Sequence, residues 1–274
     1  MTRLARRMTL RLLAVVFVAI SAGPLYWALI ASFTPEAAIF EGNVLWPRTL
    51  TLDHYRALFV ERAFWMPIRN SLVVAGATTL LSVAAGAPCA YALARLPFRG
   101  RPLVLSAVLA VSMFPQISLV SPLFLLLRGA GLVNTYPGLI LPYLTFAMPL
   151  SIWFLVGFFR QLPAELEEAA LLDGASRWRA FHEIVLPLAW PGIATTGLLT
   201  FLYSWNEFLF ALSFTLGPER YTVPVAIALF RGQYQVPWGQ VFAASIVATA
   251  PLAVLILVAQ RRIVQGLTAG GVKG

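Results

Sequence analysis

Long runs of apolar residues constrain this chain more than any other feature of its sequence. A helix needs about 20 predominantly apolar residues to cross the hydrocarbon core of a bilayer, because each residue adds about 1.5 Å along its axis. Six windows meet this requirement, so we expect an all-α membrane protein with a bundle of six transmembrane helices. The windows cover approximately residues 12–33, 71–94, 103–127, 139–159, 191–214 and 240–260.

The composition also favours a membrane protein. Hydrophobic residues make up 59% of the chain and charged residues 11%, whereas soluble domains carry about 25% charged residues. A water-soluble fold of 274 residues could not bury so much apolar surface. The first window exceeds the apolar core of about 7–15 residues in a cleavable signal peptide, which predicts an uncleaved span. We expect one transmembrane domain over residues 1–274.

The basic residues predict the orientation of the spans, because arginine and lysine resist translocation. With the N-terminus in the cytoplasm, thirteen basic residues lie in cytoplasmic segments and seven in outside segments. Both termini and the segment 160–190 are therefore predicted to be cytoplasmic. The arginines stand beside apolar runs and not on one polar face, so topology explains them better than nucleic-acid binding does.

The first half of the segment 160–190 has the features of a short helix. Pro163 suits a first helical turn, and acidic residues suit its positive N-terminal end. Apolar residues spaced at i, i+4, i+7 and i+8 predict an apolar stripe on this helix. The acidic residues are Glu165, Glu167 and Glu168, and the stripe is Leu162, Leu166, Ala169 and Ala170.

The second half of the segment predicts a second short helix. Gly174 tolerates the left-handed conformation found just after many helices, and Ser176 suits the N-cap of a helix over 177–185. Pro187 is expected to end that helix. The segment is thus a helix–turn–helix projecting from the membrane. Two interpretations stay open: it fits a cleft on a soluble partner, or it rests on the lipid surface.

The spacing across this segment resembles the EAA loop of permease subunits in binding-protein-dependent ABC importers. Three residues separate Glu168-Ala169-Ala170 from Gly174, and nine more separate Gly174 from Ile184, ahead of Leu186-Pro187. Further segments resemble the carbohydrate-uptake branch of that family, and the closest likeness is to the smaller permease of maltose- and trehalose-type importers. These segments are Asn70-Ser71-Leu72, residues 91–95, Phe114-Pro115, Trp205-Asn206-Glu207 and residues 266–274.

The resemblance implies a sugar importer in a bacterial or archaeal cell membrane, with trehalose and maltose among the compatible substrates. Its partners would be a second permease subunit, two ABC ATPase subunits and an extracytoplasmic sugar-binding protein. The outer loop tip at residues 232–235 would approach the binding protein, although such a tip is also common in ordinary surface loops. The ATPase would contact Glu168, Ala169, Ala170, Asp173, Gly174, Leu186 and Pro187, and the tip is Gly232, Gln233, Tyr234 and Gln235.

A few polar residues within the apolar windows are candidates for the translocation pathway. A carboxylate in a membrane-spanning segment costs several kcal/mol unless it is paired or faces water, which singles out Glu207. Its alternative role is a structural hydrogen bond between subunits. Tyr203 and Asn206 have the amphipathic chemistry that sugars favour, and Phe114 and Gln116 share it.

The sequence lacks the signatures of an ATPase or another enzyme. It has no glycine-rich phosphate-binding loop, and its only lysine is Lys273. Cys89, His54 and His182 have no metal-ligand spacing, so we expect no metal and no cofactor on this chain, with ATP and magnesium bound by the partner ATPase. The alternatives are an ion-coupled secondary transporter of a small polar solute, which usually carries acid relays or inverted repeats, and a membrane-embedded enzyme.

Overall fold

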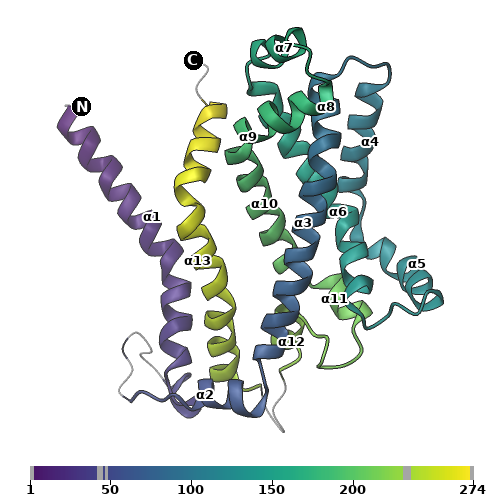
Figure 1. Cartoon of the computed structure of the whole chain (residues 1–274). Helices are drawn as coiled ribbons and strands as arrows, with labels where there is room; N and C mark the ends of the chain where they lie inside the picture. The colour runs from purple at the N-terminus through teal and green to yellow at the C-terminus, as the bar shows by residue number, and fades with distance from the viewer. Residues whose placement is uncertain (1–2, 42–45, 47–48, 231–235, 272–274) are drawn as a thin grey trace. The chain divides into compact units, whose positions relative to one another are not determined.

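A computed structural model describes residues 3–41, 46, 49–230 and 236–271, with side chains placed for those between residues 7 and 258. The described residues form helices and no strand, as predicted (Figure 1). The elements are α1 (Arg3–Ser32), η1 (Glu36–Ala38), α2 (Asp53–Arg56), η2 (Ala57–Glu61), α3 (Trp65–Arg95), α4 (Arg101–Met113), α5 (Gln116–Gly129), α6 (Tyr136–Gln161), α7 (Glu165–Leu172), α8 (Arg177–Ala180), η3 (Phe181–Val185), α9 (Leu186–Leu188), α10 (Trp190–Trp205), α11 (Leu209–Phe214), α12 (Val223–Ala228) and α13 (Trp238–Gly271).

Among the described residues, four helices are long and apolar enough to cross a bilayer. They are Arg7–Ser32 in α1, Trp65–Arg95, Tyr136–Gln161 and Trp238–Val258 in α13. Two bent pairs bring the number to as many as six if each pair is counted as one span. The helices α4 and α5 form the first pair, bent by 91°, and Arg177–Leu188 with α10 forms the second, bent by 75°.

Two of the predicted windows are not continuous helices. The window 103–127 breaks between α4 and α5, because Pro115 restricts the preceding residue and Phe114 is extended there, with ψ at 135°. The window 191–214 breaks after Trp205 and resumes at Leu209 as α11. Each of these two windows is therefore divided between two helices.

The chain divides into two compact units, and the smaller one comprises Met1–Trp65 and Ala226–Pro251. In it, both carboxylate oxygens of Glu36 accept backbone N–H groups at the start of α13, from Trp238 at 2.7 Å and Gly239 at 2.9 Å. A carboxylate is stabilising at this positive helix end. The Arg62 Nε donates to Gln240 Oε1 at 2.6 Å, which also ties the segment before α3 to α13.

The larger unit comprises Met66–Val225 and Leu252–Gly274. Within it, α6 packs against both α4 and α10. Ser151 on α6 and Thr200 on α10 share a buried hydrogen bond of 2.8 Å. The α3 backbone approaches α6 closely at Gly86, where an added Cβ would meet Ser151 and Ile152 at 3.5 Å. Small residues and buried hydroxyls are the usual means of close helix packing in membranes.

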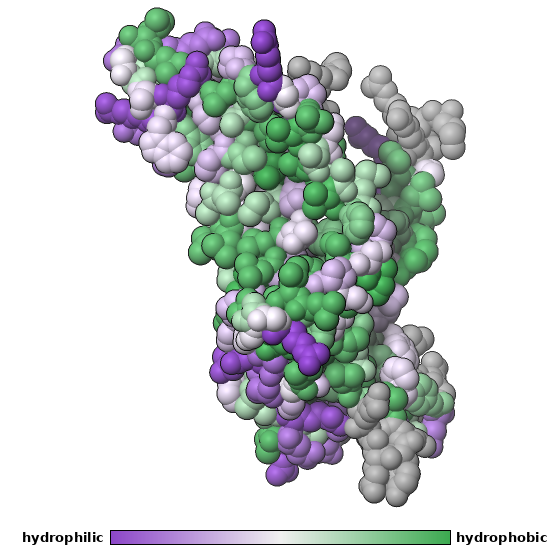
Figure 2. Space-filling model, turned by 90° about the vertical axis from the view of Figure 1, so that its right-hand side faces the viewer, coloured by the Kyte–Doolittle hydropathy of each residue, from purple (hydrophilic) through white to green (hydrophobic). Residues whose placement is uncertain are grey.

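Large hydrophobic side chains are exposed on the helices of this unit. None of the residues of α4 is buried, and on α4 and α5 the exposed fraction of Leu103 is 75%, of Met113 83% and of Leu126 69%. Figure 2 shows hydrophobic side chains over the middle of the visible face and hydrophilic side chains toward its upper and lower ends. Apolar exposure of this extent fits contact with lipid.

At its N-terminal end, α3 is held by the fully buried Asn70. The Asn70 Nδ2 donates to the carbonyl oxygens of Glu219 and Tyr221, each at 3.0 Å, and Oδ1 accepts from the Tyr136 hydroxyl at 2.7 Å. Beside it, the Asn134 amide donates to the exposed Glu219 carboxylate at 2.7 Å, and this bond lowers the pKa of Glu219. One buried amide thus joins α3, α6 and the α11–α12 connection.

We expect Asn70→Ala to destabilise the protein by about 3 kcal/mol, because it leaves buried carbonyl and hydroxyl groups without partners, each at a cost of about 1–3 kcal/mol. The thermal midpoint in mild detergent should fall by roughly 5–10 °C. The matched control is Gln161→Ala at an exposed position on α6, which should move the midpoint by about 2 °C or less. An equal shift for both variants would contradict this account of Asn70.

Candidate functional site

The loop between α6 and α10 (residues 160–190), here called the coupling loop after the role that the resemblance implies, contains a tight helix ending at Gly174. The Ala175 N–H donates to Ala170 O at 3.0 Å, and the Gly174 N–H donates to Leu171 O at 3.2 Å. This is the pattern of a Schellman motif, which needs a left-handed residue after the helix. Gly174 supplies it with φ at +87°. The predicted role of Gly174 as the turn residue is confirmed.

The second helix begins as predicted but ends later. The Ser176 hydroxyl accepts the Arg179 N–H at 3.2 Å, so Ser176 is the N-cap. The helix then continues through Pro187 to Leu188, so the prediction that Pro187 ends it was wrong. The reason is the wider π turn of η3, in which the Leu186 N–H donates to Phe181 O. This turn precedes a proline that has no N–H to donate.

Most of the predicted contact residues of the coupling loop are exposed. Glu168, Ala169, Asp173, Gly174 and Pro187 are exposed, and Ala170 and Leu186 are half-buried. The exposed surface also includes apolar side chains, since Leu172 is 88% and Trp178 64% exposed. The coupling loop therefore presents charged and apolar groups together, a composition that suits contact with another protein or with the lipid surface.

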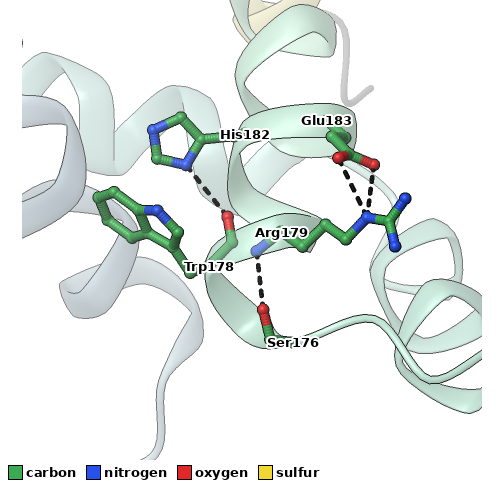
Figure 3. A network of polar contacts seen from close by, with 5 residues as sticks. All are labelled: Ser176, Trp178, Arg179, His182 and Glu183. Atoms are coloured by element: carbon green, nitrogen blue, oxygen red, sulfur yellow. Dashed lines mark hydrogen bonds and ion pairs between the residues drawn. The ribbon is translucent and has the colours of Figure 1, made fainter.

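The second helix of the coupling loop is ordered by its own side chains (Figure 3). The Arg179 Nε donates to both carboxylate oxygens of Glu183 at 3.0 Å. The His182 ring lies 4.1 Å from the Trp178 ring, and its Nδ1 is 3.0 Å from the Trp178 carbonyl oxygen. These contacts follow the i, i+4 spacing of a helix surface, so they fix the Trp178 side chain on the exposed face.

The predicted apolar stripe is not the buried face of α7. Leu166 is 46% exposed and Ala169 is also exposed, whereas Glu167 is only 7% exposed. The Tyr91 hydroxyl donates to Glu167 Oε1 at 2.5 Å, and Arg95 Nε lies 3.9 Å from Oε2. The position of Glu167 on α7 predicts only a helix-end charge. The sequence signal for its buried role is the i, i+4 spacing of Tyr91 and Arg95, which puts both on one face of α3.

A second feature of the larger unit is a cavity of about 240 Å³ beside the break between α4 and α5. Three predicted pathway residues, Phe114, Gln116 and Tyr203, line it together. The Gln116 Nε2 donates to the Tyr203 hydroxyl, so a polar pair lies in a mostly apolar lining. The remaining lining residues are Ser112, Phe146 and Leu150.

The other two predicted pathway residues bond within their own segment. The exposed Asn206 donates to the Leu202 carbonyl at 2.8 Å. The Glu207 carboxylate is buried and accepts the N–H groups of Phe210 at 2.8 Å and Ala211 at 3.1 Å. It thereby satisfies donors left free where α11 begins. The predicted outer tip, residues 232–235, lies outside the described residues.

Apolar helices with polar breaks, a small and mostly apolar cavity that holds one polar pair, and an exposed helix–turn–helix define a membrane-embedded permease. The family described as "Binding-protein-dependent transport system inner membrane component" matches residues 80–269. The chain belongs to this family.

Similar proteins cover almost the whole chain. The trehalose transport system permease protein SugB of Mycobacterium tuberculosis is 46% identical over 253 residues, 92% of each chain. The trehalose/maltose transport system permease protein MalG of Thermococcus litoralis is 43% identical over 272 residues, 98% of each chain. A crystal structure of a bacterial ABC transporter for alginate has a chain with the same fold, with a TM-score of 0.80 at 22% identity over 95% of this chain and 98% of that one.

We expect Gly174→Val to loosen the coupling loop, because a β-branched residue is a clear outlier at positive φ. A left-handed non-glycine residue costs roughly 1–2 kcal/mol. The fraction of molecules in which the turn at Gly174 is locally unfolded should therefore rise about five- to thirtyfold. Trypsin cleavage after Arg177 and Arg179 should accelerate by that factor. The control Gly174→Asn should change the cleavage rate by about threefold or less, since asparagine tolerates this conformation. Equal rates in the two variants would refute the Schellman assignment.

Proposed function

We propose that this chain is the permease subunit of an ATP-driven, binding-protein-dependent sugar importer, and that its substrate is a disaccharide such as trehalose or maltose. The observation that carries the proposal is identity above 40% along nearly the full chain to two permeases that are named for trehalose or for trehalose and maltose. The importer would lie in the cell membrane and contain a second permease subunit, two ATPase subunits and an extracytoplasmic sugar-binding protein.

The ATPase would act on this chain through the coupling loop. The exposed Glu168, Asp173, Leu172 and Trp178 offer charged and apolar contacts to a cleft on that subunit. ATP and magnesium would be bound there and not by this chain. Closure of the two ATPase subunits would move the coupling loop and switch the bundle between its inward-open and outward-open states. Reversing a 1:99 equilibrium takes about 5.5 kcal/mol, which ATP binding and hydrolysis would supply.

The sugar would pass beside the cavity lined by Phe114, Gln116 and Tyr203. Aromatic faces suit the apolar faces of sugar rings, and the Gln116–Tyr203 pair offers hydrogen bonds to hydroxyl groups. At about 240 Å³ the cavity is smaller than the roughly 300–1,000 Å³ typical of ligand pockets. We therefore infer that the second permease supplies the opposite wall of the cavity. We also propose, from the resemblance, that residues 232–235 contact the binding protein.

Uptake by the complete importer tests this proposal. Proteoliposomes containing this chain, the second permease and the ATPase should take up labelled trehalose or maltose only with its binding protein and ATP. Vanadate should abolish uptake, whereas a protonophore should leave it within about twofold. Uptake that a protonophore abolishes and vanadate leaves intact would favour the alternative, an ion-coupled secondary transporter.

Tyr203→Phe and Gln116→Leu test the cavity. Each removes one side of a polar pair that would bind sugar hydroxyls, so we expect the maximal uptake rate to fall about three- to tenfold, the scale of one hydrogen bond. ATPase co-purification should not change. The matched control is Tyr221→Phe, the same chemical change outside the cavity lining, and it should keep the uptake rate within about twofold. Equal rates for all three variants would remove the cavity from the pathway.

A further inference from the structure

We propose that Tyr91, Arg95 and Glu167, here called the clasp, transmit movement of the coupling loop to α3. This inference rests on the proposed function, because it assumes that a partner moves the coupling loop. The three residues act as positioning residues and touch neither sugar nor nucleotide. Their role follows from the way the chain connects the loop to the bundle.

The coupling loop is covalently joined to α6 and α10 but not to α3. Movement of the loop reaches α6 and α10 through the peptide backbone, whereas it reaches α3 only through side-chain contacts. The structure concentrates these contacts at the C-terminal end of α3, where Tyr91 is 6% exposed and Glu167 is 7% exposed. The clasp is the polar part of this junction.

Tyr91 contacts both halves of the coupling loop. Its hydroxyl donates to Glu167 on α7 at 2.5 Å, and its ring lies 4.8 Å from the Phe181 ring on η3. The Phe159 ring at the end of α6 lies 6.3 Å away on another side. Because one side chain of α3 touches α7, η3 and α6, a rigid displacement of the loop displaces Tyr91 with it.

Arg95 binds the point where the chain enters the coupling loop. Its Nη2 donates to the carbonyl oxygen of Leu162, which directly follows α6. Its Nε lies 3.9 Å from Glu167 Oε2 and has no hydrogen-bond partner among the described residues. This donor is buried and faces a carboxylate, so a small approach of α7 to α3 would give it a hydrogen bond. The clasp can therefore form one more hydrogen bond, from Arg95 Nε to Glu167, if α7 moves toward α3.

The clasp differs from the other ion pair of the coupling loop in its burial. The side chains of Arg95 and Glu167 are 13% and 9% exposed, whereas those of Arg179 and Glu183 are 66% and 60% exposed. Breaking a buried charged pair by removing one partner is costly, and exposed pairs contribute little. When the loop is displaced, the Arg95–Glu167 contact therefore opposes the displacement, and the exposed Arg179–Glu183 pair does not.

The clasp is tested in the assembled importer by counting sugar molecules transported per ATP hydrolysed. In Tyr91→Phe and Glu167→Gln this ratio should fall about ten- to a hundredfold, the scale of one charge-assisted hydrogen bond. ATP hydrolysis and ATPase co-purification should persist. The double variant should lose little more than Glu167→Gln alone, because the Tyr91–Glu167 hydrogen bond that Tyr91→Phe removes has already lost its charged acceptor in that variant. The control Glu165→Gln, exposed on the same helix, should keep the wild-type ratio.

Three results would overturn the clasp: an unchanged ratio, additive losses in the double variant, or loss of ATPase co-purification, which indicates a structural role only. A second measurement does not depend on sugar uptake. In the purified complex with Cys89→Ser, spin labels are attached through Ala164→Cys at the start of α7 and Leu80→Cys on α3, both exposed positions. Tyr91→Phe should broaden the distance distribution between the labels, and Glu165→Gln should not. An unchanged width overturns the proposal, whereas a wild-type importer without ATP-driven uptake overturns only the proposed function.

Discussion

The need to satisfy every backbone N–H and C=O inside a bilayer is the constraint on which this structure depends. Hydrocarbon offers no hydrogen bonds, so a spanning segment stays helical unless side chains or neighbouring helices accept the groups that a break releases. The break before α11 shows how this is done, because the buried Glu207 carboxylate accepts two N–H groups there. The free-energy cost of placing a carboxylate in the membrane is thereby offset by its hydrogen bonds to the helix end that it caps. At the break between α4 and α5, the backbone itself supplies partners: the Phe114 N–H donates to Val111 O and the Ser118 N–H donates to Pro115 O.

These breaks contrast with α3, which runs through 31 residues in one helix although Pro88 lies within it. Its two ends are held by buried polar groups, Asn70 near the start and Tyr91 with Arg95 near the end. A helix fixed at both ends can carry a displacement along its length, whereas a bent pair such as α4 and α5 can change its angle. The larger unit thus combines a continuous helix with jointed ones, which is what switching between two openings of one pathway requires.

Features encoded by neighbouring residues could be predicted from the sequence. The apolar windows, the turn at Gly174 and the N-cap at Ser176 depend on a few adjacent residues, and all of them agree with the structure. The bend after Met113 could be expected from Pro115, but not its angle of 91°, because α4 packs against α6 and α5 packs against α11, which both lie further along the chain. The burial of Glu167 could not be predicted from α7 alone, because its partner Tyr91 is 76 residues away. Pro187 does not end its helix because the π turn before it removes the usual conflict between proline and a helix.

The energies involved limit what any single contact in the coupling loop can do. A hydrogen bond to a charged group contributes about 1.5–3 kcal/mol, while reversing a two-state equilibrium takes about 5.5 kcal/mol. The bond between Tyr91 and Glu167 therefore cannot supply the whole coupling between the loop and the bundle. The remainder has to pass through the covalent junctions with α6 and α10 and through the apolar contacts of Phe181 with Tyr91 and Phe159. Loss of the clasp should consequently weaken coupling without abolishing it, because the apolar contacts around Phe181 would still join the loop to α3 and α6.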